Sequence, residues 1–192
     1  SETAEHQAVR TGAGLFDLSH MGEIFVSGPE AGAALDYALI GTLSSMAVGR
    51  ARYTMLCAQD GGVLDDLIVY RLADATWMVV ANAANTGVVR DALVERAAAY
   101  EAVVDDRSES YALLALQGPR SQEILQGLTE APLDGLKNYA VIADRVAGVD
   151  ALVARTGYTG EDGFEVLDDA ADAVPLWKAL AGADGVVPAG LS

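Results

Sequence analysis

Short apolar segments, several of them alternating with polar residues, recur along this chain, and glycine-containing turns separate most of them. Because successive side chains of a β-strand point to opposite faces, such segments predict strands. Gln59-Asp60-Gly61-Gly62 is a strong hairpin signal, and Ala147-Gly148-Val149 predicts a second hairpin. The expected strands cover residues 21–27, 51–58, 63–72, 76–81, 111–117, 141–146, 151–154 and 164–167.

Helical spacing of apolar residues lies between these strands. The expected helices cover residues 30–39, 83–100, 121–128 and 170–180, and residues 2–10 also look helical. Ser27-Gly28-Pro29 and Gln117-Gly118-Pro119 each follow a strand and open a helix, with Pro near its start. Hairpin-linked strands interspersed with helices predict an α+β fold with antiparallel or mixed sheets and flanking helices.

Composition narrows the possible functions. The chain has 192 residues, of which 52% are hydrophobic and 21% charged, so it can bury a core in one large domain or two small ones. The net charge is −16 and no basic stripe appears, which excludes a nucleic-acid binder and disfavours an anionic membrane surface. No signal peptide and no apolar run of membrane-spanning length is visible. We therefore expect a cytoplasmic protein, or one of the mitochondrial matrix in a eukaryote.

Cysteine and histidine are scarce. Cys57 is the single cysteine, which rules out an intramolecular disulfide and a cysteine-based zinc site. It lies in an apolar strand without an obvious base, so we expect a small core residue rather than a nucleophile. His6 and His20 are far apart in sequence, and we expect no metal site. Both ends look truncated, since the chain starts in the charged, helical 2–10 segment and stops at 188–192.

The segment from Thr156 to Glu165 carries three glycines at a three-residue spacing. Glycine is used where the backbone reaches positive φ or approaches another group closely. The pattern is neither a dinucleotide fingerprint nor a P-loop, and Glu161 and Asp162 would repel a phosphate. We expect a binding turn that presents Tyr158 and Glu165 to a neutral or cationic group; an ordinary hairpin turn is the alternative.

Two adjacent carboxylates, Asp65 and Asp66, interrupt an apolar strand just after a glycine turn. Period-two alternation places Asp66 on the face of Tyr70 and Asp65 on the face of Leu67. Burial of an unpaired carboxylate costs free energy or raises its pKa. One of the pair is therefore a candidate acid or base, although both could instead cap the preceding turn.

Two asparagines follow the strand at residues 76–81. Asn82 could bind a ligand through its donor and acceptor groups, whereas Asn85 is better placed to cap the following helix.

Several segments together resemble the aminomethyltransferase (T protein) family of the glycine cleavage system. The resemblance runs from end to end and covers the folate-binding region of the family. It implies two lobes, the first formed by residues 1–26 with 108–192 and the second by the inserted residues 27–107, and it implies that a C-terminal barrel domain is absent here. The segments that carry it are residues 5–10, 15–23, 51–57, 61–67, 80–85, 116–119 and 155–165.

The resemblance implies a transferase that moves an aminomethyl group from the lipoylated H protein to tetrahydrofolate, with release of ammonia and 5,10-methylenetetrahydrofolate. Asp66 matches the catalytic carboxylate, which orients the pterin and assists proton movement, an effect of roughly a hundred- to ten-thousand-fold in rate. Glu165 suits the amino-pyrimidine edge of the pterin. The positions that match the folate channel are Met21, Tyr53, Ile68, Tyr70, Asn82, Tyr139, Tyr158 and Glu165.

Two alternatives share the same folate module. One is a non-catalytic folate-binding protein, like the relatives that assist iron–sulfur cluster assembly. Those relatives carry a cysteine signature in their second half, whereas Cys57 lies early in this chain. The other is the folate-dependent region of a demethylase, which follows a flavin domain. The lack of a dinucleotide fingerprint disfavours it only weakly.

Overall fold

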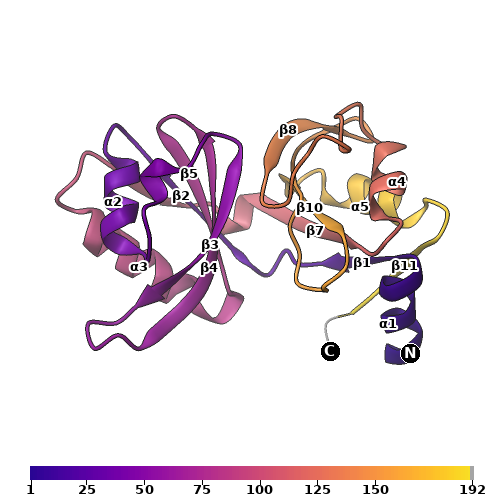
Figure 1. Cartoon of the computed structure of the whole chain (residues 1–192), viewed down its shortest axis with the longest axis horizontal. Helices are drawn as coiled ribbons and strands as arrows, with labels where there is room; N and C mark the ends of the chain where they lie inside the picture. The colour runs from indigo at the N-terminus through magenta and orange to yellow at the C-terminus, as the bar shows by residue number, and fades with distance from the viewer. Residues whose placement is uncertain (191–192) are drawn as a thin grey trace. The chain divides into compact units, whose positions relative to one another are not determined.

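The computed structural model describes residues 1–190 and divides the chain into two compact units. We call Ser1–Ser19 together with the chain from Glu109 onward the outer unit, and His20–Ser108 the inserted unit (Figure 1). We expected residues 20–26 in the first lobe. The structure assigns them to the inserted unit, because the strand that they enter pairs only within that unit's sheet. Residues 191–192, at the end that looked truncated, lie outside the described part.

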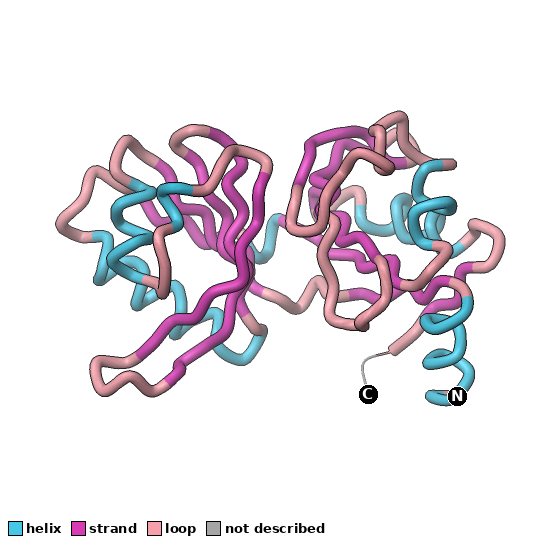
Figure 2. Tube along the Cα trace, viewed as in Figure 1, coloured by secondary structure: helices cyan, strands magenta, loops and turns pink. Residues whose placement is uncertain are grey.

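The outer unit is built on a six-stranded sheet of order β11-β1-β7-β10-β9-β8. All of its neighbouring strands are antiparallel except β1 and β11, which are parallel. The strands are β1 (Ala13–Asp17), β7 (Tyr111–Gln117), β8 (Val141–Val146), β9 (Val149–Ala154), β10 (Gly163–Asp169) and β11 (Val186–Pro188). The helices are α1 (Glu2–Thr11), α4 (Ser121–Gln126) and α5 (Ala173–Ala181), and the segment between α4 and β8 is mostly loop (Figure 2).

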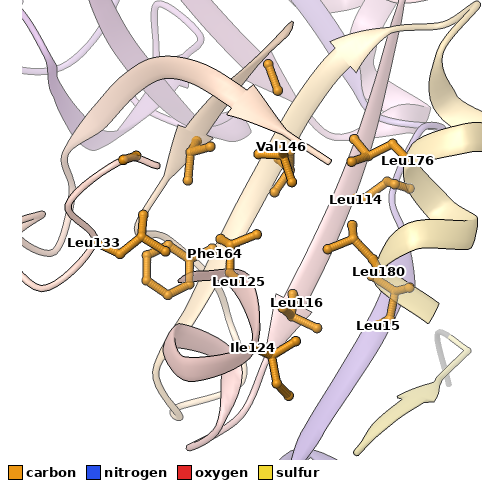
Figure 3. Packing of buried hydrophobic residues seen from close by; sticks show 14 of the residues in the cluster. Leu15, Leu114, Leu116, Ile124, Leu125, Leu133, Val146, Phe164, Leu176 and Leu180 are labelled. Atoms are coloured by element: carbon orange, nitrogen blue, oxygen red, sulfur yellow. The ribbon is translucent and has the colours of Figure 1, made fainter. Parts of the chain in front are cut away.

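Alternation along the central strands forms the core of the outer unit. Leu114 and Leu116 of β7 and Phe164 of β10 point to the same face, where α4 and α5 cover them. Leu125 of α4 and Leu176 of α5 complete this packing (Figure 3). Successive side chains of a strand point to opposite faces, so the odd-numbered residues of β10 lie on the face away from this core. Side chains of β10 that could bind a ligand outside the core are therefore the odd-numbered ones.

The inserted unit is an antiparallel five-stranded sheet of order β3-β4-β5-β2-β6, with two helices on one face (Figure 1). Its core includes Ile24, Leu35, Leu67, Val79 and Leu93, which come from both the sheet and the helices. The strands are β2 (Gly22–Ser27), β3 (Arg50–Cys57), β4 (Val63–Ala73), β5 (Thr76–Ala81) and β6 (Val103–Asp106). The helices are α2 (Ala31–Ala38) and α3 (Thr86–Ala97), with short 3-10 turns at Leu43–Ser45 (η1), Ala83–Asn85 (η2) and Ser108–Ser110 (η3).

The predicted α+β class with antiparallel and mixed sheets is confirmed. Each expected strand and helix is present, although the first turn of the helix expected at 83–100 is the separate 3-10 turn η2. Three strands were not expected: β1, β6 and β11 are short and lie at or near the sheet edges, where alternation is weakest. Within residues 1–190, no helix is both long enough and apolar enough to cross a bilayer.

Candidate functional site

The carboxylate pair lies on β4, between the neighbouring strands β3 and β5. Asp65 is buried, with 4% of its surface exposed, and shares the helix-covered face with Leu67. Asp66 is half-buried and shares the opposite face with Ile68 and Tyr70, both of which are buried. The strand therefore separates the two carboxylates: one belongs to the core side and the other to the far side of the sheet.

Strand register brings Asn82 to the carboxylate pair. Val80 of β5 is the partner of Ile68 of β4 in an antiparallel ladder. Asn82 follows Val80 by two residues and Asp66 precedes Ile68 by two, so the antiparallel register brings Asn82 beside Asp66. Asn82 Nδ2 donates to Asp66 Oδ1 at 3.0 Å, and Tyr53 Oη donates to Asp66 Oδ2 at 3.1 Å. Both oxygens of Asp66 are thus held by neutral donors, which fixes the orientation of the carboxylate.

Asp65 is held by amides alone in the hydrogen bonds that the structure shows. Its Oδ2 accepts from the Asn82 backbone N–H at 3.0 Å. Its Oδ1 accepts from Asn82 Nδ2 at 2.9 Å and from Asn85 Nδ2 at 2.7 Å. The alternative that the pair caps the preceding turn is not what is seen, because the Gly62 N–H donates to Asp60 instead.

The expectation that Asn85 caps the following helix is wrong. Asn85 is the residue before α3, but its side chain makes no capping hydrogen bond. The chain enters the helix through the 3-10 turn η2, which leaves Asn85 at φ −109° and ψ −1° rather than in the extended conformation of a capping residue. Its amide points instead to Asp65, where it satisfies a buried charge.

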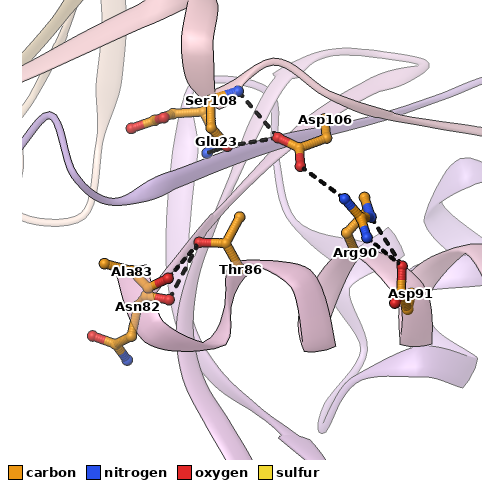
Figure 4. A network of polar contacts seen from close by, with 8 residues as sticks. All are labelled: Glu23, Asn82, Ala83, Thr86, Arg90, Asp91, Asp106 and Ser108. Carbon is orange, nitrogen blue, oxygen red and sulfur yellow. Dashed lines mark hydrogen bonds and ion pairs between the residues drawn. The ribbon is translucent and has the colours of Figure 1, made fainter.

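A second polar network surrounds the start of β2 (Figure 4). The Glu23 backbone N–H donates to Ser108 Oγ at 3.0 Å, and Ser108 Oγ donates to Asp106 at 2.6 Å. The Glu23 side chain is fully buried, and burial, followed by the charge of Asp106, raises its pKa to about 8. Sequence reasoning missed this carboxyl, although it interrupts an apolar strand just as Asp65 does.

In the outer unit, the glycine turn between β9 and β10 is filled by Gln117 from β7. Gln117 Nε2 donates to the Thr156 carbonyl at 3.0 Å, and Thr159 Oγ1 donates to Gln117 Oε1 at 3.0 Å. A Cβ atom at Gly157 or Gly163 would overlap the Gln117 side chain. Two of the three glycines therefore make room for a buried amide. The third, Gly160, has φ +77°, in the left-handed region that favours glycine.

The two carboxylates of this turn are paired with arginines. Arg155 binds Asp162 through two hydrogen bonds, of 2.9 Å and 2.6 Å, and lies 5.3 Å from the ring centre of Phe164. Arg10 of α1 pairs with Glu161 at 3.0 Å. Because both charges are compensated, the argument that this turn repels an anion does not hold.

The remaining predicted residues of the outer unit differ in exposure. Glu165 is buried, at 4% exposure, and its Oε2 accepts a hydrogen bond from Thr156 Oγ1. Tyr158 is 65% exposed and lines a cavity of about 460 Å³ with His6 and Phe16. Tyr139, at φ +56°, lines a second cavity of about 410 Å³ beside the turn. Both volumes are in the range of small-molecule sites.

In the inserted unit the predicted residues lie at or near the carboxylate pair. Tyr53 and Asn82 contact Asp66, and Ile68 and Tyr70 share its face. Met21 is half-buried and precedes β2. Cys57 is a half-buried free thiol at the end of β3. Within residues 1–190, no group of three or more His, Cys, Asp or Glu side chains is arranged to hold a metal ion.

The fold and the amide-held carboxylate pair define an α+β protein of two units with a polar site at the end of β5. The chain belongs to the family of the GCVT N-terminal domain, whose model matches residues 1–192, so the resemblance seen in the sequence is confirmed. It is 64% identical to an aminomethyltransferase of Streptomyces avermitilis and 58% identical to one of Saccharopolyspora erythraea, in each case over its whole length. These matches cover 52% and 53% of the two relatives, so the chain spans about half the length of the curated relatives that it matches.

Solved structures agree. Aminomethyltransferase T of the glycine cleavage system from Bartonella henselae superposes with a TM-score of 0.89 at 38% identity, over 96% of this chain and 50% of that one. A chain of the heterotetrameric sarcosine oxidase from Corynebacterium sp. U-96 superposes with a TM-score of 0.69 at 18% identity, over 94% of this chain and 89% of that one. The latter likeness shows a shared fold alone.

Proposed function

We propose that the intact protein carrying this chain is the aminomethyltransferase of the glycine cleavage system. In this proposal it moves the aminomethyl carbon from the lipoyl group of H protein to tetrahydrofolate, and releases ammonia and 5,10-methylenetetrahydrofolate. Family membership and the relatives' names support the reaction class. The observation that carries the proposal is Asp66, a half-buried carboxylate whose two oxygens are oriented by Tyr53 and Asn82.

The residues around Asp66 fit a reduced pterin. Carboxylate and amide oxygens accept hydrogen bonds from ring N–H groups, and the buried side chains of Ile68 and Tyr70 share the face of the sheet that carries Asp66. Tetrahydrofolate supplies the nucleophilic nitrogen that takes up the one-carbon unit. Asp66 would accept the hydrogen bond from that N–H and take its proton as the new N–C bond forms. The bond between the aminomethyl carbon and the lipoyl sulfur would break in the same transfer, and the sulfur would take up a proton and leave as a thiol. Because its orientation is already fixed, little reorganisation is needed.

The other predicted contacts are proposals of the same kind. In the inserted unit they are Met21, Tyr53, Ile68, Tyr70 and Asn82. In the outer unit they are Tyr139, Tyr158 and Glu165, of which Glu165 would accept N–H donors from the amino-pyrimidine edge. We propose lipoylated H protein as the macromolecular partner. Because the relatives named above are bacterial proteins, we propose the cytoplasm as the location.

Turnover and binding measured on the same variant test this proposal. We expect Asp66→Asn in the intact protein to lower kcat roughly a hundred- to ten-thousand-fold, because the amide keeps the shape but loses the base. Tetrahydrofolate affinity, measured by titration calorimetry, should stay within about tenfold. Asp60→Asn is the matched control: Asp60 is an exposed carboxylate in the adjacent turn, and an amide oxygen can still accept its bond from Gly62.

Two results would contradict the proposal. One is an Asp66→Asn variant that turns over at the wild-type rate. The other is a wild-type protein that binds tetrahydrofolate but does not use an aminomethyl group on lipoylated H protein; it would indicate a non-catalytic folate-binding protein or a folate-dependent demethylase instead.

A further inference from the structure

The side-chain amide of Asn82 can adopt only one of its two orientations. Its Nδ2 lies 2.9 Å from Asp65 Oδ1, 3.0 Å from Asp66 Oδ1 and 3.1 Å from the Asp66 carbonyl. All three neighbours are acceptors that carry no hydrogen. The chemistry of these neighbours determines which end of the amide faces them. The NH2 group is turned to the two aspartates, and the amide oxygen is the group left for a ligand.

Asp65 enforces this orientation together with Asp66, whose Oδ1 and backbone carbonyl also accept from Asn82 Nδ2. Asp65 is buried, and its two oxygens accept from the backbone N–H and the side-chain NH2 of Asn82. The two hydrogen bonds hold both the backbone and the side chain of Asn82 against one carboxylate. Asn85 adds a third donor to the same carboxylate at 2.7 Å. A buried charge is costly unless hydrogen bonds surround it. The donors that the structure shows around Asp65 are amides, which are neutral and do not cancel its charge. The carboxylate instead orients them, because each amide must turn an N–H group toward it.

We propose that Asp65 and Asn85 are positioning residues that make Asn82 an obligate hydrogen-bond acceptor. This inference rests on the proposed function and names the feature of the ligand that the site selects. Asn82 offers its oxygen, and Asp66 offers its remaining lone pairs, so the edge of the ligand that meets them must carry N–H donors. A tetrahydropterin ring carries N–H groups at positions where a fully oxidised pterin has bare nitrogens. The pyrimidine edge carries N–H donors in both forms, but the nucleophilic nitrogen proposed to face Asp66 carries its hydrogen only in the reduced form, so this edge of the site selects the reduced ring.

Asp65→Asn tests the inference because it changes the charge and not the shape. In the wild type, one oxygen of Asp65 accepts from the Asn82 backbone N–H and the other accepts from the side-chain amides. The new amide has a single oxygen, so it can serve only one of these two positions. The backbone N–H of Asn82 cannot turn away, so the new NH2 group faces the side-chain amides of Asn82 and Asn85. Asn82 then lies between a donor at position 65 and the acceptors of Asp66, so neither orientation satisfies all its neighbours and its oxygen is no longer fixed toward the ligand.

The measurement is the ratio of dissociation constants for folic acid and tetrahydrofolate, determined with the intact protein. We expect the wild type to prefer tetrahydrofolate and Asp65→Asn to reduce that preference by roughly tenfold, because a site built to accept a hydrogen bond rejects a ligand that lacks the donor. A purely structural role would weaken binding of both ligands alike. Asp60→Asn is again the matched control and should leave the ratio unchanged.

The double variant Asp65→Asn with Asn85→Asp separates positioning from stability. It keeps the net charge and restores one donor–acceptor pair between positions 65 and 85, so thermal stability should recover. The NH2 of residue 65 still faces Asn82, however, so the preference for tetrahydrofolate should stay lost. In the wild type the Asn82 side-chain NH2 protons should exchange slowly with solvent, and in the double variant quickly.

The outcomes separate the two claims. If the wild type binds tetrahydrofolate and Asp65→Asn leaves the ratio unchanged, positioning by Asp65 is wrong and the proposed function stands. Recovery of the ratio together with stability in the double variant also overturns it. If the wild type binds no tetrahydrofolate, the proposed function fails, and this inference fails with it.

Discussion

Asp65 in the inserted unit and Asp168 in the outer unit occupy similar places in their sheets, but they have opposite surroundings. Each lies inside a strand, and their exposures are 4% and 1%. Asp65 accepts three hydrogen bonds from amides. Among the described residues, neither side-chain oxygen of Asp168 has a hydrogen-bond partner. Burial, followed by the charge of Asp172, raises the pKa of Asp168 to about 6.

The difference shows that burial alone does not distinguish a functional carboxylate. Asp168 can relieve the cost of burial by taking up a proton, and nothing around it requires the charge. Asp65 lies among donors that need an acceptor, and these donors include the residue that orients Asp66. A buried carboxylate therefore points to function when its neighbours depend on its charge. Three stability measurements test this contrast, and hydrogen exchange at amides of each sheet reports on each unit separately.

The largest expected effect is from Asp65→Ala. Loss of the carboxylate leaves the backbone N–H of Asn82 and the NH2 of Asn85 without this acceptor and removes one of the three acceptors of the Asn82 NH2. Since each unsatisfied buried donor costs about 1–3 kcal/mol, we expect the free energy of unfolding of the inserted unit to fall by about 3 kcal/mol. Exchange at β4 and β5 amides measures this loss, and β7 amides serve as the internal control. A change below about 1 kcal/mol would mean that the amides find other partners.

Asp168→Asn should act in the opposite direction. The folded state holds a proton between pH 3.8 and about 6 that the unfolded state has released. The free energy of unfolding of the outer unit therefore falls as the pH rises through this window, by about 3 kcal/mol for two pKa units. The amide cannot ionise, so the variant should be more stable by about 2 kcal/mol at pH 7 and should lack this slope. Exchange at β10 amides from pH 4 to pH 7 checks both points, and a variant less stable than the wild type at pH 7 would contradict them.

The smallest expected effect is from Asn85→Ala, which removes one of three donors to Asp65. We expect the free energy of unfolding of the inserted unit to fall by about 1 kcal/mol, the usual value for one hydrogen bond. Asn85→Ser distinguishes the two roles of this residue, because serine is a good capping residue but too short to reach Asp65. If Asn85→Ser is as stable as the wild type, capping rather than charge satisfaction is the role of Asn85.

Local patterns predicted much of this molecule. Alternation located the strands, the Gln59–Gly62 signal located the β3–β4 hairpin, and the adjacency of Asp65 and Asp66 drew attention to β4. Residue-level prediction failed where the partner is distant in sequence or the local backbone is irregular. Asn85 was assigned to a cap because the 3-10 turn before α3 leaves no clear signal. Glu23 and Asp168 were missed because a single carboxylate in an apolar strand looks like an ordinary surface position.

The glycine turn shows the same limit. Its spacing suggested a ligand, whereas Gly157 and Gly163 adjoin Gln117, about forty residues earlier in the chain. Nothing within the turn itself reveals that an amide from β7 fills it. The pairing of Asp162 with Arg155 is local in sequence, but it could not be predicted from charge counting alone.

The insertion of Gln117 into the turn has a consequence for how this sequence can diverge. A side chain cannot be introduced at Gly157 or Gly163 while Gln117 is present. A shorter residue at position 117 would remove the hydrogen bonds that Gln117 makes with the Thr156 carbonyl and the Thr159 hydroxyl. The three positions therefore depend on one another: Gln117 must be replaced first, and only then can a side chain be tolerated at Gly157 or Gly163. Natural variants of this turn should therefore change in that order, and a descendant that keeps the glutamine should keep both glycines.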